Sequence, residues 1–467
     1  MSESKQTDYR VGNDSFWSKA WVGPLVLAIA GGLLAVLTAG PDRLGYAYLF
    51  GLFTTVTFML GGLFLVLIQF MTASHWGVSS RRIVEVIMSG APVVALLALP
   101  FIGGVVFGKI DIYNEWQSAA AHGEHGDHAD SDSDSESDDD SDSHDPEEHG
   151  LIQLGASVAQ AQDHGDEHGD HGDAAEHDEG HAHTPQETAL HHDIVAQKTG
   201  YLNTNGWAAR ALGYLILWSL LALAYFGWSR RQDESKDPKL TLRMQSLAPI
   251  SLILFGLSLT FAAFDWLMSL EAAWFSTIFG VIIFAGSAVT ILATTILIAL
   301  SFYKRGLTGD AITPVHFHDL SKLMFGFVCF WTYVSFSQWM LIWYAGIPEE
   351  ATWYHRRWAD GWQFVAYLLI FGHFVAPFLL LISRVQKLNL RWLQVMCFWL
   401  ILMHVVDIYW FVMPQAGGFV VQPADIGALL FVGGVFFAYV FWRLGKVPLV
   451  PVGDPRLPRS LHHHQTH

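Results

Sequence analysis

Long apolar runs alternate with short polar segments along most of the chain. A helix needs about 20 apolar residues to cross roughly 30 Å of hydrocarbon, and hydrocarbon leaves no partner for an unpaired backbone group. Each run is therefore predicted to be a transmembrane helix. The predicted spans are approximately Trp21–Ala39, Tyr46–Ala73, Val84–Gly108, Trp207–Trp228, Leu247–Leu270, Trp274–Tyr303, Leu320–Ala345, Gly361–Ser383, Trp392–Met413 and Ile426–Trp442. The pattern predicts an all-α integral membrane protein with about ten transmembrane helices.

Composition agrees with this class and excludes an ordinary soluble protein. Hydrophobic residues make up 52% of the 467 residues, charged residues only 15%, and the mean hydropathy is +0.32. The net charge of −17 is a local property, because 25 of the 43 acidic residues lie between Asp111 and Asp193, where there is no Lys or Arg. The rest of the chain is mildly basic. Neither distribution indicates a nucleic-acid partner.

The distribution of Lys and Arg over the loops predicts the orientation. With ten spans, 20 of the 26 basic residues fall on one side of the membrane, and the side rich in Lys and Arg is normally cytoplasmic. Both termini are therefore expected in the cytoplasm, as a segment over residues 1–20 and a tail over residues 446–467. Residues 21–108 would hold three spans and residues 206–445 the other seven.

The segment over residues 109–205 is then expected on the periplasmic side. Its acidic, low-complexity composition predicts disorder. Eleven histidines lie between His122 and His183, and such tracts can bind zinc, copper or nickel without fixed geometry. The interpretation favoured here is a solvated acidic spacer, with no metal site assigned.

The cysteine content limits the redox chemistry that the chain can carry by itself. Cys329 and Cys397 are its two cysteines, and both lie inside predicted spans. There is no disulfide framework, no CxxCH haem attachment and no iron–sulfur spacing. If the protein takes part in electron transfer, partner proteins are expected to hold the metal centres, and no covalently bound cofactor is expected here.

Ionisable residues inside the apolar runs are the main candidates for function. A carboxylate within a span costs roughly 2.5–3.5 kcal/mol on insertion scales, so it usually faces a bundle interior or a wet cavity. Asp265, with Glu271 nearby, lies in the apolar run Phe261–Phe279, and His404 and Asp407 are three residues apart on one helix face. The candidates for a proton path are Asp265, His373, His404, Asp407, Tyr409, Gln338 and Tyr333. A second set is Glu271, His316, His318 and Asp319.

Titratable groups at graded depth are what a proton path needs, because histidine titrates near neutrality and can relay protons. A structural His–Asp hydrogen bond between helices is the competing interpretation. A second alternative places a haem b between His373 and His404, on neighbouring antiparallel spans. For His316, His318 and Asp319, a role in capping the seventh helix competes with proton entry from the cytoplasm.

Three stretches carry a resemblance to a known family. FAAFDWLMSLEAAWFSTIFG, TPVHFHDLSKLMFGFVCFWTYVSFSQWMLIWY and PEEATWYHRRW resemble the ActF-type membrane subunits of alternative complex III, a bacterial quinol:cytochrome c oxidoreductase. These subunits are similar to the NrfD/PsrC-type quinone-interacting membrane proteins. The resemblance covers residues from about Trp207 to Trp442, and the first three spans agree by number and length.

The resemblance implies two four-helix bundles plus two flanking helices, in a multi-pass protein of the bacterial inner membrane without its own haem or cluster. It implies as partners a sister NrfD-like membrane subunit, a periplasmic iron–sulfur subunit and multihaem c-type cytochromes, in addition to lipid. Menaquinone or another quinone would be bound by the complex, with quinol oxidation mainly in the sister subunit. The implied role is a proton path coupled to that oxidation. The alternatives are an NrfD-type quinone-binding anchor and a stand-alone transporter.

Overall fold

The computed structural model describes residues 9–12, 15–126, 191 and 193–462. These residues form helices, with no strand among them. Nine helical segments of the described chain are long and apolar enough to cross a membrane, which confirms the predicted all-α membrane fold. The predicted acidic segment falls mostly on residues 127–190, outside the described residues, as do nearly all of its eleven histidines.

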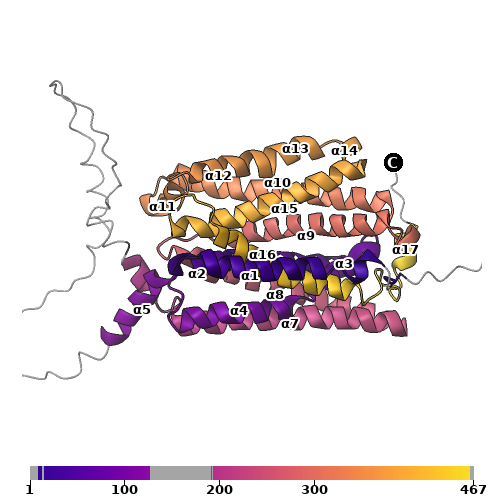
Figure 1. Cartoon of the computed structure of the whole chain (residues 1–467), viewed down its shortest axis with the longest axis horizontal. Helices are drawn as coiled ribbons and strands as arrows, with labels where there is room; N and C mark the ends of the chain where they lie inside the picture. Colours follow the sequence, from indigo (N-terminus) through magenta and orange to yellow (C-terminus); the bar gives the residue numbers. More distant parts are fainter. Residues whose placement is uncertain (1–8, 13–14, 127–190, 192, 463–467) are drawn as a thin grey trace, which may run out of the picture. The chain divides into compact units, whose positions relative to one another are not determined.

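The helices run nearly side by side in one bundle (Figure 1). They are α1 (Val22–Thr38), α2 (Pro41–Met71), α3 (Val78–Met88), α4 (Ala91–Val106), α5 (Asn114–Gly126), α7 (Thr204–Ser235), α8 (Pro238–Trp266), α9 (Phe279–Lys304), α10 (Pro314–Ala345), α11 (Pro348–Arg356), α12 (Trp362–Leu368), α13 (Ala376–Leu381), α14 (Arg384–Leu388), α15 (Leu390–Val412), α16 (Pro423–Leu444) and α17 (Leu457–Leu461). A π-helix, η4 (Leu369–Val375), joins α12 to α13. Short 3₁₀ turns are η1 (Phe16–Ser18), η2 (Met268–Leu270), η3 (Gly309–Ala311) and η5 (Met413–Ala416).

We call the end of the bundle that carries α11 the loop end, and the end that carries α17 the tail end (Figure 1). The first and last described segments meet at the tail end, where the backbone N–H of Leu449 donates to the carbonyl of Tyr9 at 2.7 Å. Both described ends of the chain therefore lie on one side of the bundle. This placement agrees with an even number of crossings, whichever compartment that side faces.

The spans pack as two groups of four with two helices alongside. One group contains α2, the α3–α4 segment, α7 and α8, and the other contains α9, α10, the α12–α13 segment and α15. The two groups meet where α2 packs against α9, and both of these helices are buried along most of their length. The remaining helices, α1 and α16, pack along each other, and α16 packs on α2. The polar residues that α2, α9 and α15 carry are thereby brought to the interior.

The first predicted span, α1, is shorter than the others at 17 residues. It is attached to α16 through positions without side chains. A Cβ added at Gly427 would lie 2.6 Å from the backbone nitrogen of Ala35, and one at Gly434 would lie 2.7 Å from the carbonyl oxygen of Pro24. Such small residues let two helices approach closely, and this contact places α1 in the bundle despite its length.

Two spans depart from regular helix. The third is interrupted at Ser89 and Gly90, where α3 ends and α4 begins, and Pro92 lies in the first turn of α4. Proline is tolerated there because the first-turn N–H groups have no partner within the helix. The eighth span widens into the π-helix η4, which contains His373. Single π-turns inside transmembrane helices are frequent at functional sites.

The apolar run Phe261–Phe279 is not one continuous element. The helix α8 ends at Trp266, η2 follows, and α9 begins only at Phe279. The expectation that Glu271 lies toward the middle of a membrane-embedded run is therefore wrong, because Glu271 lies in the turn at the loop end. Lys198 closes this turn from outside, since its Nζ donates to the carbonyl oxygens of Ala272 at 2.6 Å and Ala273 at 3.1 Å.

Candidate intramembrane polar site

A polar cluster lies where α2, α9, α10, α15 and η4 meet. His404 and Asp407 project from α15 one turn apart and are 0% and 2% exposed. The Nε2 of His404 lies 2.9 Å from the hydroxyl of Thr57 on α2. The indole N–H of Trp331, from α10, donates to Oδ2 of Asp407 at 3.0 Å. The predicted shared face of His404 and Asp407 is thus an interior face that three helices complete.

His373 joins the cluster through the same tryptophan. Its imidazole ring stacks on the indole of Trp331, with ring centroids 4.0 Å apart and planes inclined by 27°. The side chain of His373 is fully buried, and neither ring nitrogen has a hydrogen-bond partner among the described residues. Trp331 therefore contacts two of the three ionisable side chains, one by its N–H and one by its face.

Glycines leave the room that these rings occupy. A Cβ at Gly286 of α9 would lie 2.8 Å from both Cε1 and Nδ1 of the His404 ring and 3.8 Å from Oδ2 of Asp407. A Cβ at Gly372, beside His373, would lie 2.7 Å from the sulfur of Met403. The carbonyl of Gly372 accepts a hydrogen bond from the indole of Trp399 at 2.7 Å. Side chains at either glycine would displace the cluster.

Hydroxyl side chains continue the polar interior along α9. Ser287, Thr290, Thr294 and Thr295 are buried, and each hydroxyl donates to the carbonyl four residues earlier. Their oxygens keep lone pairs that can accept further hydrogen bonds. On α2, Thr54 is buried with a hydroxyl that has no partner among the described residues. The neighbourhood of the cluster is therefore more polar than lipid-facing helices are.

The cluster has the chemistry of proton exchange. It combines one carboxyl group with two imidazoles, and the nitrogens Nδ1 of His404 and both ring nitrogens of His373 are unpartnered among the described residues. Buried polar groups are normally hydrogen-bonded by protein or by ordered water, so these nitrogens are able to exchange protons with such partners. Ionisable groups buried at this depth usually mark ion pathways or proton relays.

The geometry does not favour a haem between the two histidines. Thr57 covers Nε2 of His404, and Gly286 covers its Cε1–Nδ1 edge. The face of His373 is already covered by Trp331. Within the described part of the chain, no three or more His, Cys, Asp or Glu side chains are grouped so that they could hold a metal ion.

Asp265 lies outside this cluster. Its carboxylate accepts two hydrogen bonds from Arg210 of α7, from Nε at 2.9 Å and from Nη2 at 3.0 Å, and a third from the hydroxyl of Tyr214 at 2.7 Å. The side chain is 0% exposed. Two parallel N–H bonds from one guanidinium are a strong and directional contact, so Asp265 holds α8 to α7 near the loop end.

Tyr409 also has its own partners at the loop end of α15. Its hydroxyl donates to Oδ2 of Asp425 at 2.9 Å and accepts from Nη2 of Arg43 at 3.1 Å. Arg43 forms an ion pair with Asp425 at 2.7 Å. This triad ties the starts of α2 and α16 to the end of α15. The sequence analysis did not single out Arg43 or Asp425, since each lies at the polar border of an apolar run.

Glu271 is part of a third charged group at the loop end. It lies 3.3 Å from Nη1 of Arg357 and accepts from Gln415 at 3.0 Å. Arg357 is buried and also donates to the carbonyl oxygens of Trp353 at 3.0 Å and Phe411 at 3.1 Å. Burial lowers the pKa of Arg357 to about 10, and the neighbouring Glu271 opposes that change.

The remaining candidates are distributed over both ends and the outer face. Gln338 accepts from Ser276 at 3.1 Å, near the loop end. Tyr333 is 66% exposed on the outer face of α10 and does not reach the cluster. At the tail end, Nδ1 of His316 accepts from the backbone N–H of Thr313 at 3.2 Å as part of a capping box. Asp319 pairs with Lys322 at 2.7 Å, and His318 is buried nearby.

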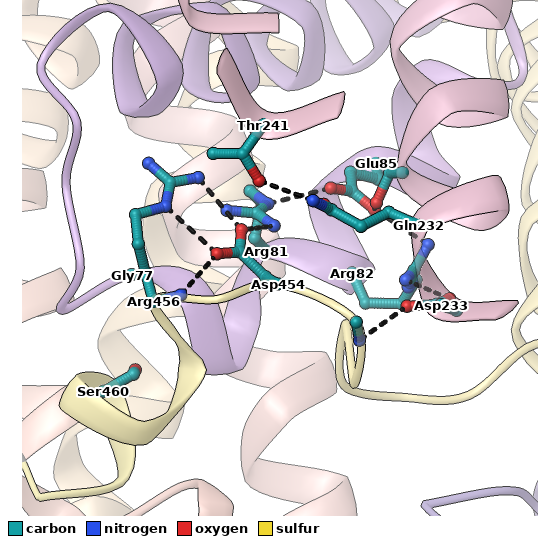
Figure 2. A network of polar contacts seen from close by, with 12 residues as sticks. Gly77, Arg81, Arg82, Glu85, Gln232, Asp233, Thr241, Asp454, Arg456 and Ser460 are labelled. Carbon is teal, nitrogen blue, oxygen red and sulfur yellow. Dashed lines mark hydrogen bonds and ion pairs between the residues drawn. The ribbon is translucent and has the colours of Figure 1, made fainter. Parts of the chain in front are cut away.

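The sequence analysis missed the largest charged network, which lies at the tail end (Figure 2). Glu85 of α3 binds Arg81 at 2.8 Å and Arg82 at 3.0 Å, and its Oε2 also accepts from Ser229 at 2.8 Å. Arg82 continues to Asp233 at 2.5 Å. The side chains of Arg81, Arg82 and Glu85 are 0% exposed. In the sequence, the two arginines counted only as topology signals.

The C-terminal segment completes this network. Asp454 binds Arg81 at 2.6 Å and Arg456 at 3.0 Å, as Figure 2 shows. Burial alone would raise the pKa of Asp454, but the two guanidinium groups outweigh that effect and hold the pKa well below its ordinary value of 3.8. Gly453 lies so close to Gln232 that a Cβ would be 1.9 Å from its carbonyl oxygen. The segment therefore fits tightly against the ends of α3 and α7.

Together, the fold and the site define a multi-pass membrane protein with a buried cluster of ionisable side chains in its interior. The chain matches no protein-family model, and no curated protein matches it significantly.

Proposed function

We propose that this chain is a membrane subunit of a quinol:cytochrome c oxidoreductase of the alternative complex III type. In this proposal, it contributes a transmembrane proton path that is coupled to quinol oxidation in a sister NrfD-like subunit. The observation that carries the proposal is the buried cluster of His373, His404 and Asp407 around Trp331. The sequence motifs that resemble this family supply the electron-transfer context.

The proposed path passes through this cluster and no longer through all the residues first considered. Asp265 is held by Arg210, and Tyr409 by Arg43 and Asp425. Carboxylates and hydroxyls in such ion pairs stabilise helix contacts. We therefore assign the proton-carrying role to Asp407, His404 and His373, with the hydroxyls of α9 as hydrogen-bonding neighbours.

The proposed partners are the sister membrane subunit, a periplasmic iron–sulfur subunit and multihaem c-type cytochromes, with a quinone bound by the complex. One observation supports a partner inside the membrane. The outer face of α10 exposes Tyr333, Phe336, Trp343 and Tyr344. The outer faces of α7 and α8 instead expose mainly Leu and Ile. Aromatic residues are enriched at protein–protein interfaces, so α10 is the face proposed for the sister subunit. The orientation with both termini in the cytoplasm of a bacterium is part of the proposal.

The decisive experiment has two stages. First, gentle detergent extraction is expected to bring c-type haem and iron–sulfur subunits with this chain. Second, Asp407→Asn keeps an oxygen that can accept from Trp331 but removes the ionisable group. The complex with this variant is expected to assemble and to release fewer protons per electron than wild type.

Two controls make the result interpretable. Glu234→Gln changes an exposed carboxylate at the tail end and should leave proton release unchanged. If Asp407→Asn releases protons normally, the assigned path is wrong. If the chain is extracted alone and without haem, the oxidoreductase proposal fails. If quinol oxidation itself is lost in the variant while assembly is intact, the NrfD-type quinone-anchor alternative replaces the proton path.

A further inference from the structure

A groove opens between α1 and α4 near the loop end of the bundle. It has a volume of about 590 Å³, within the range of roughly 300–1,000 Å³ that is typical of ligand sites. Ile29, Leu33 and Val36 of α1 form one wall, Pro100 and Phe101 of α4 form the opposite side, and α2 and α16 contribute the rest. The groove arises because α1 is attached mainly through α16, so that its other face overhangs the bundle.

The interior of the groove offers little to a polar ligand. Its lining side chains are almost all aliphatic or aromatic. The hydroxyl of Tyr48 is the exception, and it already donates to the carbonyl of Leu97 at 2.8 Å. A quinone ring inside the groove would therefore find no free hydrogen-bond donor from this tyrosine, whereas a hydrocarbon chain needs none.

The charge at the rim identifies the kind of ligand. Lys109 lines the groove, is exposed, and follows α4 by three residues at the loop end. It forms no ion pair within the part of the chain that the structure describes. A cation immediately beyond the end of a membrane span lies at the depth of lipid head groups. Its charge complements a phosphate with a net negative head group.

We propose that this groove is a binding site for an anionic phospholipid. One acyl chain lies between α1 and α4, against Leu33, Val36 and Phe101. The head-group phosphate lies at the rim, paired with Lys109. The proposal goes beyond the proposed function and does not depend on it, because the site is separate from the interior cluster and involves no redox step.

The test uses the purified full-length protein, stripped of endogenous lipid by detergent. The protein is incubated with mixed micelles containing equal amounts of phosphatidylglycerol and phosphatidylcholine that carry the same acyl chains. Retained lipid is measured by native mass spectrometry. For wild type, we expect retained phosphatidylglycerol to exceed phosphatidylcholine about fivefold, the effect of roughly one basic residue at a membrane surface.

Two variants separate the head-group contact from the chain contact. Lys109→Gln should abolish the preference for phosphatidylglycerol. Val36→Trp should fill the groove and lower retention of both lipids; since Val36 is 72% exposed, the change is not expected to affect folding. The matched controls are Lys446→Gln, an exposed lysine at the tail end, and Leu257→Trp, 55% exposed on α8. Both should bind lipid like wild type.

Three results would overturn the proposal. The first is equal retention of the two phospholipids by wild type. The second is retention that Val36→Trp leaves unchanged while gel filtration shows a folded protein. The third is a quinone, retained from the native membrane in place of phospholipid and lost in Val36→Trp, which would assign the groove to a different ligand.

Discussion

The indole nitrogen of Trp331 donates a hydrogen bond to Asp407 across 3.0 Å in the interior of the bundle. Asp407 is 2% exposed, and the opposite use of the same indole, its ring face, is taken by His373. One tryptophan of α10 thus fixes a carboxyl group of α15 relative to an imidazole of η4. The cluster is held by the packing of three separate spans.

Trp331→Phe is predicted to destabilise the protein by about 1–3 kcal/mol, because Asp407 would lose its only donor printed by the geometry while the aromatic stacking on His373 is largely kept. Thermal unfolding in detergent measures the effect. The control, Trp339→Phe, changes an indole that is 41% exposed on the same helix and should cost less than about 0.5 kcal/mol. Equal unfolding temperatures for the two variants would contradict the prediction.

Gly286→Ala is predicted to disturb the cluster through a single added methyl group. Its Cβ would lie 2.8 Å from the His404 ring, and overpacking of this kind costs about 1–3 kcal/mol. Gly256→Ala on α8 is the matched control, because a Cβ there meets nothing within 4 Å. It should leave stability unchanged or raise it by up to about 1 kcal/mol, since alanine favours helix over glycine. Thermal unfolding of both variants checks the pair, and comparable losses would show that the site at Gly286 can relax.

The spacing of His404 and Asp407 was sufficient to predict that they share a helix face, because three residues is nearly one helical turn. Their burial followed from the cost of charge in hydrocarbon. The partners could not be predicted in this way. Trp331 and Thr57 come from helices that are distant in sequence, and nothing in the sequence of α12–α13 indicated a π-helix at His373.

Asp265 shows the limit of the same argument. An acidic residue in an apolar run is costly both when it carries protons and when it is paired, and the sequence alone does not distinguish these uses. Arg210 lies 55 positions earlier, at the start of another span. Likewise, Arg81 and Arg82 act as topology signals in the sequence, whereas the structure buries them among carboxylates from three segments of the chain.

Asp454→Asn is predicted to loosen the C-terminal segment. The substitution leaves Arg81 buried with Glu85 but without its second carboxylate, and breaking a buried ion pair costs about 3–5 kcal/mol. Limited proteolysis of the purified protein should cut the C-terminal segment faster than in wild type. Glu234→Gln, an exposed change near Asp233, should be cut like wild type. Identical digestion of all three proteins would contradict a role for Asp454 in holding the segment.

The same carboxylate makes a prediction about pH. The pKa of Asp454 is held below its ordinary value of 3.8 in the folded protein by Arg81 and Arg456. Its contribution to stability is therefore complete above pH 3.8 and is lost as the pH falls through the lower folded-state value. The unfolding temperature of wild type should fall in this acidic range more than that of Asp454→Asn, which has no such proton to bind. Parallel acid titrations of the two proteins check the difference in slope.

Asp265→Asn separates a structural role from a proton-carrying one. Because Asp265 accepts two hydrogen bonds from Arg210 and one from Tyr214, the variant should lower the unfolding temperature. It should leave proton release per electron unchanged in whatever complex assembles. Arg210→Gln should destabilise to a similar degree, and the double variant should cost clearly less than the sum, with a coupling of about 0.5–3 kcal/mol. Additive losses would show that the pair is not coupled. A fall in proton release with stability intact would return Asp265 to the path.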